Sequence, residues 1–239
     1  MYKLLRKFIP NEFIYKMKRK MGVPDQTSSF LRLKKLGFSP TTVLDIGAYE
    51  GKWALEFSKL FPEANILMIE GQEQKSNQLL EISKKIKNSS VKIALLGSEK
   101  KAVEFNIYET ASSIFKEDNN PTTITETIEL QLLDDIITNS TFEKCDFIKL
   151  DTQGAELEIL KGGSLALSHA EVVLMEVSML GIYKNAPLVD EVIQFMKSKN
   201  FVLYDICSIM RRPYDDALFQ SDFLFVKENH FLRNSTRWQ

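Results

Sequence analysis

Short apolar runs alternate with amphipathic stretches from residue 42 onward, and this alternation predicts a layered α/β fold. Runs of five or six largely apolar residues are typical of strands buried on both faces, and they fall at 43–47, 65–70 and 91–96. The two intervening stretches, 53–61 and 73–86, repeat apolar residues at helical spacing. Strand, helix, strand, helix and strand in this order form half of a doubly wound parallel sheet.

The second half of the chain repeats this pattern after a polar interval. Further strands are predicted at 147–151, 171–177, 201–206 and 223–226, and helices at 155–161 and 188–199. The last two strands, joined by a loop, indicate an antiparallel edge. In the interval, alternation at 103–107 and 128–132 predicts two exposed strands. The polar stretch 112–125 between them is either a substrate lid or a mobile connection.

The composition is that of an ordinary globular protein, with 44% hydrophobic and 26% charged residues in a chain of 239. We expect one Rossmann-like domain at 41–239 and a helical appendage at 1–40, because regular periodicity begins only near residue 42. The net charge of -1 gives no electrostatic reason to expect nucleic acid as a partner. Cys145 and Cys207 are too few for a disulfide framework, which favours reduced thiols and a cytoplasmic location.

Basic and apolar residues crowd the first twenty positions. The basic ones are Lys3, Arg6, Lys7, Lys16, Lys18, Arg19 and Lys20. No apolar run reaches the roughly 20 residues that a membrane span requires, and none has the form of a signal peptide. Two interpretations stay open for this basic segment. It is a capping helix or a contact within a homo-oligomer, or it makes a peripheral contact with an anionic membrane or glycolipid.

A glycine turn follows the first predicted strand, where ligands bind in open parallel sheets. Residues 45–51 are DIGAYEG, in which Gly47 permits close backbone approach and Gly51 lets the next helix begin tightly against a ligand. Asp45 suits a cationic ligand group, and the spacing lacks the GxGxxG pattern of a dinucleotide site, which disfavours NAD. Glu70 ends the next strand about 20 residues downstream, where a carboxylate can bind ribose hydroxyls.

Three segments together resemble the FkbM family of S-adenosylmethionine-dependent methyltransferases. They are VLDIGAYEG at 43–51, MIEG at 68–71 and DFIKLDTQGAELEILKGG at 146–163. The first two occur in class I methyltransferases at large, whereas the third is the more specific sign. Ser112, Ser113 and residues 130–136 also resemble the family's middle region.

The resemblance covers residues 42–228 and carries expectations about fold and activity. It implies a seven-stranded Rossmann-like sheet, S-adenosylmethionine as cofactor, and O-methylation of a hydroxyl on a sugar, glycan or other small metabolite. The expected cofactor-binding residues are Asp45, Gly47, Ala48, Gly51, Glu70, Gly71, Leu96 and Gly97. Two positions depart from the family pattern: Tyr49 often is Asn in the family, and Gln153 commonly is Glu. The first should alter cofactor packing modestly, and the second removes a charge on the acceptor side.

Methyl transfer to a hydroxyl needs in-line alignment and a group that takes the hydroxyl proton. Asp151 is the first candidate because it ends a predicted strand, although it could instead cap the following helix. Gln153, Glu156 and Glu176 are further candidates, Glu156 as a first-turn helix acid and Glu176 as a strand-end carboxylate. No metal is assigned, because Asp151 and Glu176 lack a clear third ligand.

Two other functions compete with methyl transfer. A nucleotide-dependent oxidoreductase is disfavoured by the glycine spacing and by the absence of a hydride-transfer motif. A methyltransferase-fold binding protein without turnover would retain the cofactor residues, and Gln153 keeps this alternative open. The sequence does not identify the methyl acceptor, because fold and cofactor motifs do not encode it.

Overall fold

A computed structural model describes residues 17–18, 20–107, 124–181 and 183–238. The main sheet contains β1 (Thr42–Ile46), β2 (Asn65–Glu70), β3 (Ser89–Ile93), β6 (Phe147–Leu150), β7 (Val172–Ser178), β8 (Phe201–Ile206), β9 (Met210–Arg211) and β10 (Leu218–Lys227). A separate hairpin contains β4 (Ala102–Ile107) and β5 (Ile124–Glu129). The helices are α3 (Gln26–Lys35), α4 (Lys52–Leu60), α5 (Ser76–Ser83), α6 (Leu133–Ile137), α7 (Glu156–Lys161), α8 (Ser164–His169) and α9 (Val189–Ser198), with 3-10 turns η1 (Glu73–Lys75) and η2 (Phe231–Arg233).

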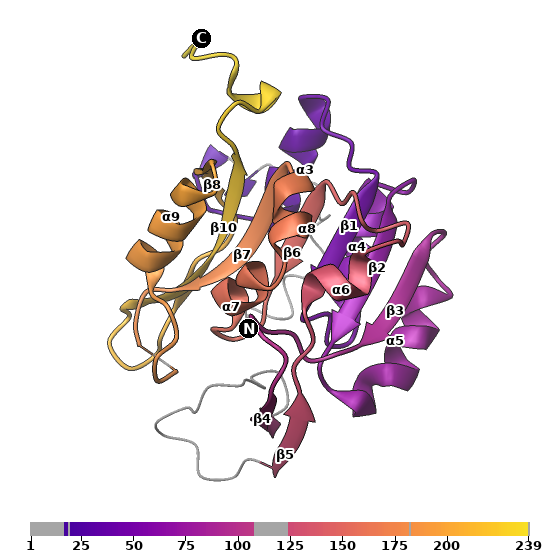
Figure 1. The fold of residues 1–239 in the computed structure, drawn as a ribbon. Coiled ribbons are helices and arrows are strands. Elements are labelled where there is room, and N and C mark those ends of the chain that lie inside the picture. Colours follow the sequence, from indigo (N-terminus) through magenta and orange to yellow (C-terminus); the bar gives the residue numbers. More distant parts are fainter. Residues whose placement is uncertain (1–16, 19, 108–123, 182, 239) are drawn as a thin grey trace, which may run out of the picture.

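The main sheet has the strand order β3-β2-β1-β6-β7-β10-β8, with β9 beside β10 (Figure 1). The strands from β3 to β7 in this order are parallel, and β10 is antiparallel to both β7 and β8. The expected Rossmann-like mixed sheet is therefore confirmed. Seven strands form the continuous row, and the two-residue β9 adds an eighth within the described part of the chain.

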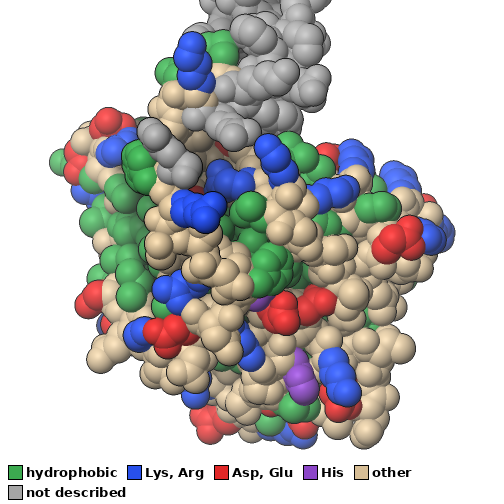
Figure 2. Space-filling model, turned by 90° about the horizontal axis from the view of Figure 1, so that it is seen from above, with side chains coloured by type: hydrophobic (Ala, Val, Ile, Leu, Met, Phe, Trp, Pro, Cys, Tyr) green, Lys and Arg blue, Asp and Glu red, His purple; other side chains and the backbone are tan. Residues whose placement is uncertain are grey.

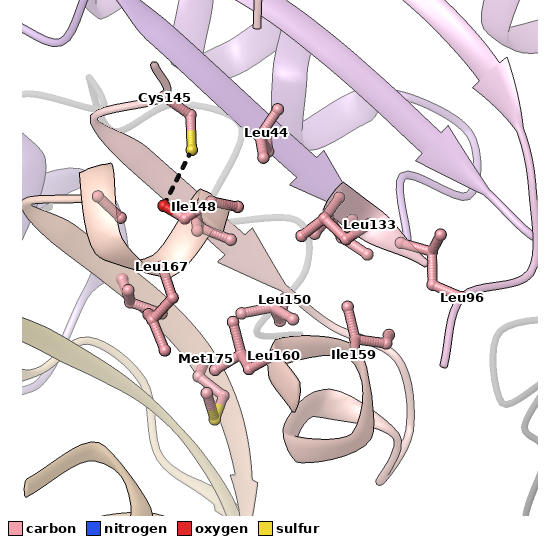
Figure 3. Packing of buried hydrophobic residues seen from close by; sticks show 14 of the residues in the cluster. Leu44, Leu96, Leu133, Cys145, Ile148, Leu150, Ile159, Leu160, Leu167 and Met175 are labelled. Atoms are coloured by element: carbon pink, nitrogen blue, oxygen red, sulfur yellow. Dashed lines mark hydrogen bonds between the residues drawn. The ribbon is translucent and has the colours of Figure 1, made fainter. Parts of the chain in front are cut away.

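Two apolar layers cover the two faces of the sheet. On one face, side chains of β1, β6 and β7 pack against α6, α7, α8 and α9, and Figure 3 shows Leu44, Ile148 and Leu167 in this layer. The buried Cys145 thiol donates to the carbonyl of Ala166 at 3.5 Å, and burial raises its pKa to about 12.

On the other face, aromatic rings join α3 and α4 to the sheet. The Phe30 and Phe57 rings lie 5.1 Å apart, and Phe57 lies 5.1 Å from Phe147 of β6. The helix α3, from the segment expected as an appendage, thus packs directly on this face of the sheet. Residues 1–16 and 19 lie outside the described residues, and so does most of the basic segment.

Several predicted elements differ from the structure at their ends. The strand expected at 91–96 is β3 at Ser89–Ile93, because residues 89–93 pair with β2 while Leu96 leaves the sheet and bridges Gln131. The helix expected at 73–86 is divided into η1 and the shorter α5. The α8 helix and β9 were not predicted. The two residues of β9 are too few to show a period, and Gly162 and Gly163 predict the end of the helix that precedes α8.

The carboxyl ends of the parallel strands meet at the same end of the molecule as the β4–β5 hairpin (Figure 1). Figure 2, seen from above, shows the opposite end, where basic and acidic side chains are intermixed around apolar surface. No helix among the described residues has both the length and the apolarity to cross a membrane. The segment 108–123, which includes Ser112, Ser113 and most of the expected lid, lies outside the described residues.

Candidate active site

The strand order of the sheet reverses between β1 and β6. From β1 the chain proceeds outward through β2 to β3, and it then returns to place β6 on the other side of β1. Ligands bind in open α/β sheets beyond the carboxyl ends of the strands at such a switch point. The two loops that meet there are 47–51 after β1 and 151–154 after β6.

The loop after β1 has left-handed backbone at every second residue from 47 to 51. The φ angles are 74° at Gly47, 48° at Tyr49 and 71° at Gly51. A Cβ on Gly47 would lie 1.9 Å from the carbonyl oxygen of Asp151, so only glycine allows the two loops to touch. A Cβ on Gly51 would lie 2.9 Å from Ile82 Cγ2, so this glycine allows α5 to pack against the turn.

Tyr49 occupies the position where the resemblance stated above implies Asn. Left-handed backbone is uncommon outside glycine, and Asn tolerates it better than an aromatic residue does. The Tyr49 ring is instead covered by the Lys75 ammonium, 3.7 Å from the ring centre. Tyr49 therefore adopts left-handed backbone with its ring covered by Lys75. The effect of this residue on cofactor packing stays a prediction.

Glu70 fixes the backbone around both strand ends. Its Oε2 accepts a hydrogen bond from the Tyr49 amide at 2.7 Å, and its Oε1 accepts one from the Gln72 amide at 2.9 Å. The residue is 6% exposed, and burial raises its pKa although the backbone amides oppose this shift. A carboxylate oxygen can accept more than one hydrogen bond, and the binding of ribose hydroxyls by Glu70 stays a prediction.

The other expected cofactor residues are packed against protein atoms. A Cβ on Gly71 would lie 2.9 Å from Leu95 Cδ1, and one on Gly97 would lie 2.6 Å from Leu130 Cδ1. Ala48 and Leu96 are buried in the two apolar layers, Ala48 on the α3 and α4 side and Leu96 on the other. Any contact of these four positions with a cofactor would involve mainly the backbone.

Asp45 is fully buried and faces a lysine that the sequence analysis did not single out. The Lys149 ammonium lies 3.1 Å from Asp45 Oδ1 and 3.7 Å from Asp151 Oδ2, and it donates to the Gly47 carbonyl at 3.0 Å. Burial lowers the pKa of Lys149, but the Asp45 and Asp151 carboxylates reverse this and raise it. The cation beside Asp45 is therefore a side chain of the chain itself. Lys149 could have been identified from the sequence, because it is a lysine inside the otherwise apolar strand FIKL at 147–150.

The Gln153 amide joins two of the candidate catalytic carboxyls. Its Nε2 donates to Asp151 Oδ1 at 3.2 Å and to Glu176 Oε2 at 3.1 Å. The Tyr183 hydroxyl donates to Gln153 Oε1 at 2.7 Å, and Gln220 Nε2 donates to Glu176 Oε2 at 3.0 Å. An amide donates to two carboxyls at once, which a glutamate could not do. Gln153 thus has a defined place between the two acids.

Glu156 has a different environment from the other candidates. Its buried Oε1 accepts from the Thr152 amide at 2.8 Å, the Thr152 hydroxyl at 3.0 Å and the Gly154 amide at 3.3 Å. These bonds hold the loop that presents Asp151. The alternative in which Asp151 caps the next helix is wrong, because Ala155 stands at the N-cap and no side chain caps it. The Asp151 side chain is instead 44% exposed.

A cavity of about 300 Å³ opens beside these acids, on the face of the sheet that carries α3 and α4. Its lining residues are Gln26, Trp53, Lys149, Leu150, Asp151, Leu174, Glu176, Ser208, Ile209, Met210, Gln220, Ser221 and Asp222. Within the described ranges, no three His, Cys, Asp or Glu side chains converge as a metal site. The cavity gives Asp151 and Glu176 access to a small molecule.

The pKa of the Glu176 carboxyl is strongly raised. Burial, followed by the charges of Asp151 and Glu156, raises its pKa to about 9 from the usual 4.5. The carboxyl is therefore neutral at pH 7 and can donate a hydrogen bond. The Asp151 side chain, in contrast, is 44% exposed and is open to the cavity.

We expect the Glu176→Gln variant to lose less stability than the wild type as the pH rises from 6 to 9. The native chain keeps the Glu176 proton through this interval while the unfolded chain has released it, so the free energy of unfolding falls with pH. Gln at this position has no proton to lose. Urea unfolding at pH 6, 7.5 and 9 checks this, and equal slopes for both proteins would contradict the raised pKa.

Residues 45–203, more than half of the chain, match the methyltransferase FkbM domain. The chain belongs to the FkbM methyltransferase family. Gln26, residues 208–210 and residues 220–222 line the cavity but lie outside the segment that matches the FkbM domain. No curated protein matches the chain.

Solved structures with similar backbones include several methyltransferases. A precorrin-6y C5,15-methyltransferase from Geobacter metallireducens has 15% identity and a TM-score of 0.48, over 84% of this chain and 88% of that one. TrmK of M. capricolum, solved with S-adenosylhomocysteine, has 12% identity and a TM-score of 0.49, over 83% and 67%. Aeropyrum pernix fibrillarin, solved with S-adenosylmethionine, has 12% identity and a TM-score of 0.47, over 77% and 66%.

Proposed function

We propose that this FkbM-family protein transfers the methyl group of S-adenosylmethionine to a hydroxyl of a sugar, glycan or other small metabolite. The observation that carries the proposal is the contact between the two loops at the switch point. The Gly47 turn touches the Asp151 carbonyl so closely that a Cβ would lie 1.9 Å from it. A cofactor loop and an acid at the mouth of a cavity are thereby brought together.

The residues around β1 and β2 fit the proposed cofactor. Glu70 is anchored by two backbone amides and keeps acceptor capacity for the ribose hydroxyls. The Gly47 turn exposes backbone beside it, and Lys149 holds the Gly47 carbonyl in place. When bound, S-adenosylmethionine supplies an electrophilic methyl group on a sulfonium.

Residues of the loop after β6 and of β7 itself act on the acceptor. The cavity positions the acceptor hydroxyl and limits access of water. As the acceptor oxygen gains the methyl group and the bond from carbon to sulfur breaks, the hydroxyl proton passes to the Asp151 carboxylate. Gln153 orients this carboxylate, and neutral Glu176 donates a hydrogen bond inside the cavity without adding a negative charge.

We expect S-adenosylhomocysteine to bind and to raise the melting temperature. A ligand of the native state at 100 times its Kd stabilises by about 2.7 kcal/mol. Calorimetry and thermal unfolding measure both effects. Glu70→Gln should weaken binding, because one oxygen acceptor is replaced by an amide donor.

Absence of S-adenosylhomocysteine binding to the wild-type protein would contradict the proposal. Binding without methyl consumption over a panel of hydroxyl acceptors would favour the binding protein, and spectral change of NADH would favour the oxidoreductase.

A further inference from the structure

The helix α3 contributes a side chain to the cavity although it lies before the family-matched segment. Gln26, the first residue of α3, lines the cavity together with Asp222 of β10 and Trp53 of α4. Two further segments outside residues 45–203, at 208–210 and 220–222, complete that wall. This wall of the cavity is thus built largely from elements that the family match does not include.

The Gln26 amide has one allowed orientation. Its Oε1 accepts from the Trp53 indole at 2.8 Å, and its Nε2 donates to Asp222 Oδ2 at 3.1 Å. An indole N–H only donates, and Asp222 Oδ2 is the acceptor in the other bond, so a flipped amide would lose both bonds. Gln26 therefore fixes the rotamer of Asp222 and the position of the Trp53 ring at the same time.

Asp222 lies beside the candidate catalytic acids. It is the register partner of Glu176 across β7 and β10, and its own amide donates to Ser208 Oγ at 2.9 Å. Its carboxylate therefore reaches the cavity from the strand next to Glu176. This adds a third carboxyl to the cavity beside Asp151 and Glu176, and its oxygens can accept a hydrogen bond.

The charges of the lining favour an uncharged ligand. Asp151, Glu176 and Asp222 line the cavity, and the cationic side chain in the lining is Lys149. Lys149 already lies within 3.7 Å of both Asp45 and Asp151. An anionic group in the cavity would lie near these acidic side chains, and the cation in the lining is already paired with carboxylates. A hydroxyl, in contrast, can donate to either carboxylate.

We propose that Asp222, oriented by Gln26, accepts a hydrogen bond from a second hydroxyl of an uncharged acceptor and thereby determines which acceptor enters the cavity. Gln26 is the positioning residue, and α3 is part of the acceptor site. This inference rests on the proposed function, because it takes the cavity as the place where the acceptor binds.

Trp53 provides a spectroscopic signal from the cavity wall. The chain has two tryptophans, and the other, Trp238, is 96% exposed. The full-length Trp238→Phe protein, saturated with S-adenosylhomocysteine, is titrated with methyl glycosides of glucose, galactose, mannose, rhamnose and fucose, and with methyl glucuronide. We expect at least one neutral glycoside to change the Trp53 emission, and the glucuronide to bind more weakly than the glucoside.

The Asp222→Asn and Gln26→Leu variants test the two roles. Each should raise the Kd of the bound glycoside about tenfold or more, the scale for losing a hydrogen bond to a charged group. The Kd of S-adenosylhomocysteine should stay within about twofold of the wild-type value, since no cofactor residue is changed. In turnover with that glycoside, the loss should be in KM rather than in kcat.

Asp205→Asn is the matched control. Asp205 also anchors α3, because it accepts from Ser29 Oγ at 2.6 Å and pairs with Arg32, but it does not line the cavity. If it raises the glycoside Kd as much as Asp222→Asn does, the effect comes from α3 docking and the inference is wrong. An unchanged Kd in Asp222→Asn, or no glycoside binding while S-adenosylhomocysteine is bound, also overturns it. Absence of S-adenosylhomocysteine binding would instead overturn the proposed function and this inference with it.

Discussion

The Gly47→Ala variant should lose about 2–6 kcal/mol of stability and bind S-adenosylhomocysteine weakly or not at all. The new Cβ would lie 1.9 Å from the Asp151 carbonyl oxygen and 2.8 Å from its carbon, so the two loops must separate. Left-handed backbone and forced overpacking each cost about 1–3 kcal/mol, and here they act together. Gly47→Val should be worse, because its branched side chain needs still more space. Urea unfolding and calorimetry measure the two effects.

Gly37→Ala separates backbone strain from steric contact. Gly37 also has left-handed backbone, with φ of 96°, but a Cβ there would meet no atom within 4 Å. We expect this variant to lose only about 1–3 kcal/mol, the cost of left-handed backbone alone, and to bind S-adenosylhomocysteine normally. Equal losses in the two variants would show that contact between the β1 and β6 loops does not matter.

The Asp151→Asn variant should lose about 10²-fold or more in kcat while its affinity for S-adenosylhomocysteine stays nearly unchanged. The substitution keeps the size of the side chain and removes the basic oxygen that takes the hydroxyl proton. The loop should keep its shape, because Glu156 and not Asp151 accepts the hydrogen bonds from Thr152 and Gly154. Single-turnover kinetics with an acceptor glycoside measure the loss.

Asp222→Asn serves as the contrast for Asp151→Asn. Both changes replace one carboxyl of the same cavity by an amide, so an effect that follows from the loss of any lining carboxyl would act alike in both. We expect Asp151→Asn to lower kcat and Asp222→Asn to raise KM. A kcat for Asp151→Asn within threefold of the wild type would show that another group takes the proton.

Local pattern alone predicted the main elements of the fold. The strands 65–70 and 201–206 have the predicted bounds, because short apolar runs between turns leave little freedom in where a buried strand begins and ends. The helices at 155–161 and 188–199 agree within one residue with α7 and α9. The end of 91–96 was wrong because pairing with β2, rather than the apolar character of residues 94–96, decides where β3 stops.

The sequence by itself also determined the family, since the segments around Asp45, Glu70 and Asp151 are contiguous motifs that can be recognised without coordinates. Only the tertiary structure decided which side chains face one another. The pairing of Asp45 with Lys149 joins residues about a hundred positions apart, and Gln26 lies 196 positions from Asp222. The raised pKa of Glu176 likewise arises from burial and from acids on other elements. Periodicity reports the face on which a residue lies, whereas these contacts depend on strand order and register, which the sequence specifies only through the packing of the whole sheet.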